Sequence, residues 1–279
     1  MPENIQSFFT TQSLSTSPGD FVYLYTGIQP KLNEAYDAVH NCLFHLAQVD
    51  TAEPAIDSLR IKHNLNIYSA ENILAIIASL DNRSLYYPRL PDHRYIGICA
   101  HYSLLLCSLL RHFKIPCRMR CGFETQSTES HHDHWLCEYW NDRQKLWIRL
   151  DPELSPILSY KWDLGYDPLS IPEDVFMTGS EAWLICHSEK NDPNSQDCDV
   201  AGWTGGRDFV LANLVFDFLA LNKIELSPWD DLDIIKNGYD ALTTSQIDLM
   251  YRIAQAGLAV NNDHAALIKL FLDNQDLFT

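Results

Sequence analysis

The chain has 279 residues, of which 46% are hydrophobic and 20% charged, and its formal net charge is −17 at pH 7. This is ordinary globular composition, so intrinsic disorder, collagen and coiled coil are excluded as descriptions of the whole chain. The acidic balance also argues against a sequence-independent grip on nucleic-acid phosphates or on an anionic membrane. We therefore expect no nucleic acid and no membrane among the partners.

The acidic charge is concentrated in the second half of the chain. Residues 1–154 carry a net charge of −4, whereas residues 155–279 carry −13. This division indicates two regions with different roles. Within the first, the Ser, Thr and Gln content of residues 1–20 predicts a loose arm, and residues 21–154 are expected to form a core with N-terminal helices. The division further predicts that residues 155–279 form an acidic, mostly helical extension packed on that core.

The N-terminal residues show neither a basic segment nor a long apolar run, so they do not read as a secretory signal. The longest apolar stretch, residues 102–110, is far shorter than the roughly 20 residues of a membrane span. We expect a soluble, cytoplasmic protein whose eight cysteines are reduced and mostly buried.

In chain order, hydrophobic spacing first predicts a helix within residues 30–49. Ser69 is a favoured N-cap for a second helix, which ends near Asp81. Residues 100–113 are apolar nearly all round, and such a helix lies inside a domain rather than on its surface.

Three short strands follow, with a turn at residues 141–144 that joins the last two into a hairpin. The predicted strands are residues 117–123, 134–140 and 146–151. Farther along, residues 153–178 are rich in turn-forming residues. The rest of the chain predicts helices, with a capping box at Ser245–Asp248 and a C-cap at Gly257. These helices are expected at residues 207–222, 228–236, 245–256 and 262–272.

Cys99 differs from the other cysteines because it follows Gly97-Ile98 and opens the central helix. The positive end of the helix dipole favours a thiolate at that position. Seven basic residues and one acidic residue lie between Arg83 and Arg120, which predicts a local surplus of positive charge. Cys99 is therefore the candidate nucleophile.

A nucleophilic thiol needs a base, and the base needs a group that orients it. His134 begins the strand His134-Trp-Leu-Cys-Glu138, and Asp151 ends the next strand. The hairpin places these strands side by side, and the helix that starts at Cys99 must pack on the same sheet. We therefore expect His134 to act as base and acid and Asp151 as its orienting partner.

Together, these motifs resemble the transglutaminase-like superfamily. The resemblance runs from about Tyr95 to Pro152 and lies in GICAHYSLLLCSLLRHFKIPCRMRCGF, HWLCEYW and LWIRLDP. It implies that Cys99, His134 and Asp151 form a catalytic triad. It also implies an α+β fold with a papain-like core, in which a central helix packs on an antiparallel sheet, between N-terminal helices and a mostly helical C-terminal extension.

The tail segments GSEAWLIC and NLVFDFLALNKIELSPWD resemble part of a bacterial subgroup of this superfamily, whose activity is unsettled. One position departs from the pattern, because many relatives have an acidic residue two positions after the nucleophile and this chain has His101. The departure puts the environment of the thiol in doubt.

Five further residues are candidates for substrate binding. Arg89 and Arg94 precede the nucleophile and could hold a carboxylate, although a solvated loop face is the simpler interpretation. Trp135 could shield the His–Asp pair from water or belong to the core. Asn213 and Asp217 are four apart on a predicted helix, where they could line the site with a polar, acidic face or brace the fold.

No cofactor is expected. The run His131-His132-Asp133-His134 suggests a metal, but only His132 and His134 share a face of a strand and no third ligand is visible nearby. No Asp-rich calcium loop is present either, so we predict no metal.

The predicted reaction is acyl transfer through a thioester, and three functions remain open. The first is a cysteine peptidase or amidohydrolase acting on a peptide, a protein or a small amide. The second is an amide-forming acyltransferase or cross-linking transglutaminase, and the third is a non-catalytic binding module on the same fold. The final acyl acceptor depends on the shape of the site, which the sequence leaves open.

Overall fold

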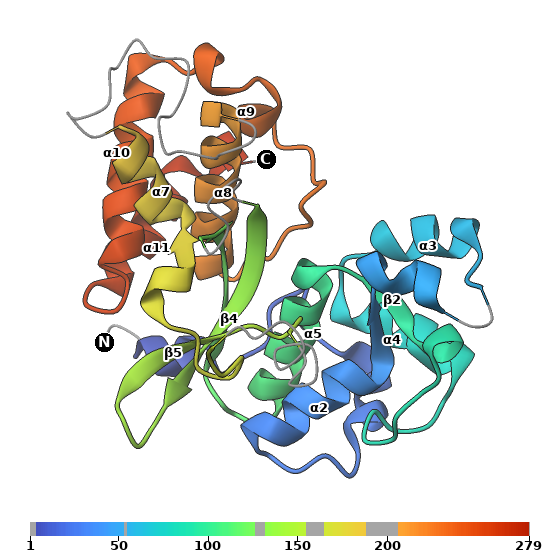
Figure 1. Cartoon of the computed structure of the whole chain (residues 1–279). Coiled ribbons are helices and arrows are strands. Elements are labelled where there is room, and N and C mark those ends of the chain that lie inside the picture. Colours follow the sequence, from blue (N-terminus) through green and yellow to red (C-terminus); the bar gives the residue numbers. More distant parts are fainter. Residues whose placement is uncertain (1–3, 53–54, 126–131, 155–164, 188–205, 279) are drawn as a thin grey trace. The chain divides into compact units, whose positions relative to one another are not determined.

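A computed structural model of the chain describes residues 4–52, 55–125, 132–154, 165–187 and 206–278. The chain folds into two compact units (Figure 1). One unit, here called the nucleophile unit, comprises residues 6–119 and 136–171, and the other, the tail unit, comprises residues 1–5, 120–135 and 172–279. The expected break was at residue 154. The units divide instead at residues 119–120, 135–136 and 171–172, and the first two of these points lie within strands.

The nucleophile unit contains most of the helices of the first half of the chain. Their bounds are α1 (Ile5–Phe8), α2 (Leu32–Cys42), α3 (Ser58–Leu65), α4 (Ala70–Leu80) and α5 (Cys99–His112), with 3₁₀ helices η1 (Gly19–Tyr25), η2 (Leu46–Thr51) and η3 (Pro91–His93). As expected, Ser69 caps α4, because its side chain accepts a hydrogen bond from the Asn72 N–H at 3.3 Å.

The expected helix at residues 30–49 is shorter than predicted. After α2 the chain turns into the strand β1 (Leu43–His45), which pairs in parallel with β2 (Tyr95–Gly97). The register places His45 beside Gly97, two residues before Cys99. Three-residue strands are too short to show a period of two, so the sequence pattern did not reveal this pair.

The second sheet has four strands in the order β5–β4–β3–β6. The strands are β3 (Cys117–Glu124), β4 (Asp133–Asn141), β5 (Leu146–Leu150) and β6 (Phe176–Thr178). β4 pairs antiparallel with β5, and β3 pairs antiparallel with β6. The predicted hairpin is therefore confirmed, whereas β6 lies in a stretch for which no strand was expected, because it is rich in turn-forming residues.

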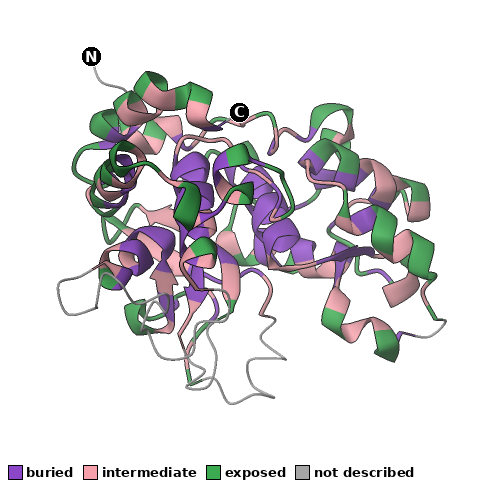
Figure 2. Ribbon diagram, turned by 90° about the horizontal axis from the view of Figure 1, so that it is seen from above, coloured by how far each residue is buried: buried purple, intermediate pink, exposed green. Residues whose placement is uncertain are grey.

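Helix α5 forms the core of the nucleophile unit, and its residues from Ala100 to Arg111 are all buried (purple in Figure 2). It contacts the sheet directly: the Cys137 thiol donates to the Ser103 carbonyl, and the Arg111 Nε donates to the Cys117 carbonyl at 2.9 Å. The predicted central helix on an antiparallel sheet is confirmed.

The N-terminal segment, expected to be a loose arm, is packed in the structure. Phe9 and Thr16 are fully buried. The Phe9 carbonyl accepts from the Cys117 N–H at 3.1 Å, and the Thr16 hydroxyl accepts from the Arg111 guanidinium at 3.0 Å. The segment is ordered for two reasons. The apolar ring of Phe9 is more stable out of water, and the buried guanidinium of Arg111 needs hydrogen-bond acceptors in place of water.

The tail unit is mostly helical, as predicted. Its helices are α7 (Gly179–Cys186), α8 (Gly206–Leu221), α9 (Asp233–Lys236), α10 (Thr244–Leu258) and α11 (His264–Asn274), with 3₁₀ helices η4 (Glu173–Val175), η5 (Tyr239–Ala241) and η6 (Gln275–Phe278). α7 packs closely on α8, where a Cβ at Gly179 would lie 2.3 Å from the Asn213 carbonyl oxygen. A side chain at this glycine would therefore separate the helices.

Some details of the tail differ from the expectations. The capping box of α10 is Thr243 with Gln246 rather than Ser245 with Asp248, and the helix continues past Gly257. Residues 228–232 are not helical, and α9 has only one turn. Hydrophobic periodicity locates a helix better than its ends, because several polar residues in a row can each cap it.

Six cysteines are free thiols, and all except Cys99 are buried. The expectation of reduced cysteines is wrong for Cys186, which is disulfide-bonded, and Cys198 lies outside the described residues. Among the helices that the structure describes, none combines the length and apolarity needed to cross a membrane.

Candidate functional site

Cys99 is the first residue of α5 and is half-buried. The chain leaves β2 at Gly97, and Ile98 has the extended conformation of an N-cap. His101 then holds the helix start, because its Nδ1 accepts a hydrogen bond from the Ile98 N–H at 3.2 Å. His101 thus takes the helix-capping position that Glu or Gln occupies in a capping box.

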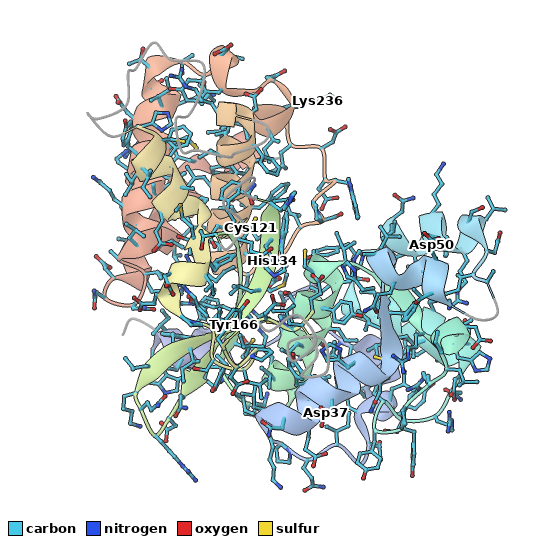
Figure 3. All side chains as sticks on the ribbon, viewed as in Figure 1. Asp37, Asp50, Cys121, His134, Tyr166 and Lys236 are labelled. Carbon is cyan, nitrogen blue, oxygen red and sulfur yellow. The ribbon has the colours of Figure 1, made fainter. Side chains whose placement is uncertain are left out.

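His134 lies on β4 (labelled in Figure 3), near the end of the strand at which β5 finishes. The hairpin register pairs Cys137 with Leu150, and Asp151 directly follows the end of β5. The expected meeting of His134 and Asp151 stays a prediction. The ring of His134 lies 6.5 Å from the ring of Phe176.

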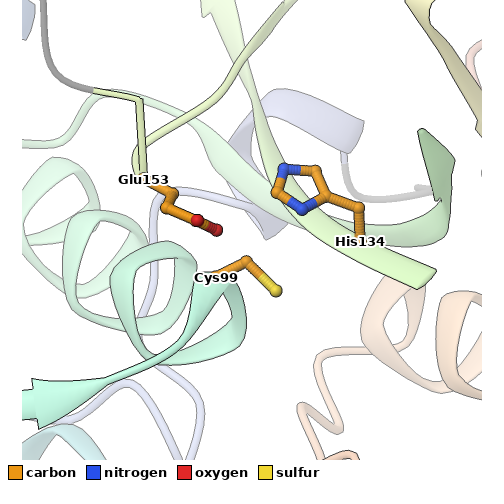
Figure 4. A group of neighbouring side chains, drawn as sticks. All are labelled: Cys99, His134 and Glu153. Carbon is orange, nitrogen blue, oxygen red and sulfur yellow. The ribbon is translucent and has the colours of Figure 1, made fainter. Parts of the chain in front are cut away.

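The structure brings Cys99, His134 and Glu153 together (Figure 4). One ligand atom of each residue, a sulfur, a ring nitrogen and a carboxylate oxygen, lies within 4.8 Å of the other two. The carboxylate in this group belongs to Glu153, which the sequence analysis did not identify. Its one sequence signal is its place two residues after Asp151, in the segment LDPE.

Asp151 is 5% exposed and is fixed by its own backbone and side chain. Its N–H donates to the Pro168 carbonyl at 2.8 Å, and its carbonyl accepts from the Tyr36 hydroxyl at 3.3 Å. Its carboxylate accepts from the Glu153 N–H at 2.9 Å. That last bond fixes the turn that carries Glu153, and the orienting role of Asp151 stays a prediction.

Glu153 has a partner within the nucleophile unit. The His45 Nε2 lies 3.1 Å from Glu153 Oε1, and each side chain is 20% exposed. His45 comes from the end of β1, which lies beside the β2 segment leading to Cys99. The short parallel pair thus carries a second histidine toward the candidate nucleophile.

The thiolate, imidazole and carboxylate donors of this group are also ligands that Zn²⁺ accepts. Cys99, His134 and Glu153 could therefore hold a metal ion as well as perform acid–base chemistry. The run of histidines indicated no such set by itself: His131 lies outside the described residues, and the side chain of His132 is exposed.

The surplus of positive charge that was expected around Cys99 is taken up by other partners. Arg118 is buried and pairs with Glu138, with its Nε donating at 2.7 Å, and Arg120 is buried and pairs with Asp217 at 2.8 Å. Arg83, on the surface, donates to Asp81 and lowers the pKa of that carboxyl to about 2. Counting charges along the sequence therefore overstated the cations available to the thiol.

Arg89 and Arg94 stabilise the loop before the nucleophile. The Arg89 guanidinium is buried and donates to backbone carbonyls between Asp81 and Tyr87, including that of Tyr87 at 3.1 Å. The Arg94 Nε donates to the Arg89 carbonyl at 2.7 Å. These hydrogen bonds give Arg89 and Arg94 a structural role in the loop. A contact of either side chain with substrate stays a prediction.

The other predicted substrate residues are buried in the tail unit. Trp135 is 4% exposed, and its ring lies 6.0 Å from that of Phe216. Asn213 accepts from the Cys121 thiol at 2.9 Å, and Asp217 is 0% exposed. Asn213 and Asp217 therefore form no exposed acidic face, and their contact with substrate stays a prediction that their observed partners do not support.

The comparison with family models agrees with the motifs. Residues 83–152 match the model of the transglutaminase-like superfamily, a range that includes Cys99, His134 and Asp151. Among solved structures, the chain is similar to a candidate cysteine protease from Cytophaga hutchinsonii, with a TM-score of 0.36 and 13% identity. That similarity covers 64% of this chain and 46% of the other. A search of curated proteins finds no match.

This chain thus spans less than half of the length of that solved protein. The family match is specific to the segment that contains the helix of Cys99 and the hairpin, and it supports cysteine-dependent catalysis at the level of the superfamily. Residues 83–152 are thus similar to the transglutaminase-like superfamily, the family that the motifs of this segment resemble.

Proposed function

We propose that the protein is a cysteine-dependent acyl-transfer enzyme that hydrolyses a peptide or another amide bond through a thioester. The observation that carries the proposal is the approach of Cys99, His134 and Glu153 to within 4.8 Å at the start of a buried helix. A thiol with an imidazole in reach is the arrangement that nucleophilic catalysis needs.

The reaction has two halves. His134 removes the proton of Cys99, and the thiolate attacks the carbonyl carbon of the amide. His134 then gives that proton to the leaving nitrogen, so an amine departs and a thioester remains on Cys99. Water, deprotonated by His134, attacks the thioester and releases the acid and the thiol.

Two other groups have supporting roles in this proposal. The negative oxygen of the tetrahedral intermediate would lie near the Cys99 N–H, at the positive end of the α5 dipole. Asp151 would orient the imidazole of His134. If an amine replaces water in the second half, the same site forms an amide, so acceptor choice alone separates hydrolase from acyltransferase.

A direct test is to incubate the full chain with p-nitrophenyl acetate and to locate the acetyl group by mass spectrometry of peptides. We expect acetylation of Cys99, followed by its loss in water. His134→Ala should slow both steps by about 10²-fold or more, which is the usual contribution of a general base. Cys42→Ala is the matched control, because burial raises the pKa of that thiol to about 12.

Acetylation spread over several cysteines, or equal in the parent protein and His134→Ala, would contradict the proposal. The metal interpretation gives a different result. Zn²⁺ bound by Cys99 would protect the thiol from acetylation, and a chelator would restore the reaction. Insensitivity of the acetylation rate to a chelator would support the acyl-transfer function instead.

A further inference from the structure

Helix α2 contacts two parts of the nucleophile unit that carry candidate site residues, and the proposed reaction gives it no role. Its residues Tyr36 and His40 are one helical turn apart, and their rings lie 4.7 Å from each other. Tyr36 is 1% exposed, and the Nε2 atom of His40 is buried. Both side chains therefore belong to the interior of this unit.

The first contact of α2 is with the turn that follows β5. The Tyr36 hydroxyl donates to the Asp151 carbonyl at 3.3 Å. The His40 ring hydrogen-bonds the next carbonyl, that of Pro152. Glu153 follows directly, and its N–H donates to the Asp151 carboxylate at 2.9 Å. Two neighbouring side chains of one helix thus hold two consecutive carbonyls of the turn that carries both carboxylates.

The second contact of α2 is with the helix of the candidate nucleophile. The His40 ring lies 5.5 Å from the ring of Tyr102, which is buried in the first turn of α5, three residues after Cys99. His40 therefore lies between this turn of α5 and the Pro152 carbonyl. A side chain in that place fixes the separation between the thiol of Cys99 and the carboxylate of Glu153.

Both donors keep their protons at neutral pH. Desolvation lowers the pKa of His40 to about 4, so the ring is neutral and carries one N–H. Within the described part of the chain no group hydrogen-bonds its Nε2, so Nδ1 is the nitrogen that donates to the Pro152 carbonyl. Burial and the charge of Asp151 raise the pKa of Tyr36, whose hydroxyl therefore stays a donor.

Packing alone does not explain why these two side chains are polar. Burying a hydroxyl or an imidazole is unfavourable unless it is hydrogen-bonded, and an apolar ring would fill the same space without needing a partner. The carbonyls of Asp151 and Pro152 lie beyond Leu150, the last residue of β5 that pairs with β4. Buried carbonyls need donors, and the side chains of α2 supply them where the pairing has ended.

We propose that Tyr36 and His40 are positioning residues, which hold the turn after β5 at a fixed distance from Cys99. For its effect on acyl transfer, this proposal rests on the proposed function, in which the base is oriented from that turn. Misplacement of a reacting group by about 1 Å can cost about 10²-fold in rate, so small changes in this distance are measurable.

The first test measures the distance without any acyl transfer. In the full chain with Glu153→Cys, dibromobimane bridges the introduced thiol and Cys99 in the presence of a chelator, and mass spectrometry of peptides locates the bridge. The reagent reacts with one thiol and then closes on the second, so the rate of closure reports how closely the two are held together. Adding Tyr36→Phe removes only a hydroxyl, and we expect closure to slow by about tenfold.

Tyr25→Phe is the matched control. The Tyr25 hydroxyl is also buried, and it hydrogen-bonds the Ser108 hydroxyl at 2.7 Å, in the second half of α5. Both tyrosine variants should lower the melting temperature by about 2–4 °C, the effect of one hydrogen bond in a chain of this size. Only Tyr36→Phe should slow closure. Equal closure rates in the two variants would overturn the proposal.

Two substitutions of His40 separate the role of its N–H from that of its ring. His40→Asn keeps a donor near the position of Nδ1 but loses the ring, whereas His40→Phe keeps a ring against Tyr36 and Tyr102 but loses the donor. A packing role predicts faster closure in His40→Phe. We expect faster closure in His40→Asn, and an equal or opposite order would overturn the role of the N–H. Tyr36→Phe tests the same turn if a His40 variant does not fold.

The second readout is the reaction itself. Loss of the acetyl group from Cys99 uses His134 as base, so it should slow by about tenfold in Tyr36→Phe and not in Tyr25→Phe. Slower closure with an unchanged loss of acetyl would overturn the role in catalysis.

The two proposals fail in different ways. If acyl transfer is wrong, Cys99 of the parent chain is not acetylated, whereas Tyr36→Phe still slows closure. If the positioning role is wrong, the parent chain is acetylated, and Tyr36→Phe closes at the rate of Tyr25→Phe.

Discussion

His101 makes the stability of the fold depend on pH in a calculable way. The side chain is fully buried, and desolvation lowers its pKa from 6.5 to about 4. A hydrogen bond to the Ile67 backbone opposes this shift, and the Ile98 N–H occupies Nδ1. The folded protein therefore holds a neutral ring at pH values where the unfolded chain binds a proton.

The sign follows from the two pKa values. Above about pH 6.5 the ring is neutral in both states, so the full stability is present. Between pH 6.5 and pH 4 the unfolded chain takes up a proton that the folded chain refuses, and stability falls as the pH falls. At pH 5 the loss from this one residue is about 2 kcal/mol relative to pH 7.5.

The test compares urea unfolding of the parent chain and His101→Gln at pH 7.5 and pH 5. Glutamine at the third helical position can still accept from the N-cap N–H, so the cap of α5 is retained. The variant loses ring packing against Tyr68 and Tyr95, which lowers stability at both pH values. Between pH 7.5 and pH 5, however, the free energy of unfolding of the variant should fall by about 2 kcal/mol less than that of the parent chain.

His40 has a similarly lowered pKa and remains in the variant, so some acid sensitivity persists. His63→Gln, at an exposed position of α3, controls for the removal of any histidine. If His101→Gln and the parent chain lose the same free energy between pH 7.5 and pH 5, the buried neutral ring is not what destabilises the protein in acid.

Three further predictions concern packing. Asp217→Asn should lower the free energy of unfolding by about 3 kcal/mol, because it leaves the buried Arg120 without its counter-charge. Asp248→Asn, at an exposed position, is the control and should change the melting temperature little. Equal melting temperatures of the two variants would contradict this prediction. Gly122→Ala should destabilise the chain by several kcal/mol in urea unfolding, since a Cβ there would lie 2.0 Å from a carbonyl oxygen of β6. Ser69→Ala should cost about 1 kcal/mol by removing the cap of α4, and a change within error would deny the cap its role.

The parts of the fold that the sequence predicted are those in which local pattern and burial agree. The helix that starts at Cys99 has an apolar surface on every side, so only a buried position suits it. The hairpin has an explicit turn between two strands. The parallel pair β1–β2 lacks such a signal, because its strands are three residues long and residues 46–94 lie between them in the sequence.

The candidate site also contains residues that the sequence predicted and residues that only the structure reveals. Cys99 and His134 belong to motifs with a chemical reason for their positions, so sequence reasoning identified them. His45 and Glu153 become neighbours only through the register of β1 on β2 and the turn after Asp151. Likewise, the partners of Arg118 and Arg120 lie on distant segments, and a count of nearby charges could not show that these cations were already paired.

The burial of α5 has a consequence for the entropy of substrate binding. Backbone amides in a helix whose residues from Ala100 to Arg111 are all buried should exchange with solvent only when the whole unit unfolds. The thiol of Cys99 is attached to the first turn of that helix, so its position is fixed before any ligand arrives. Little ordering of the nucleophile then remains to be done on binding, and more of the interaction energy is left to lower the barrier of the reaction.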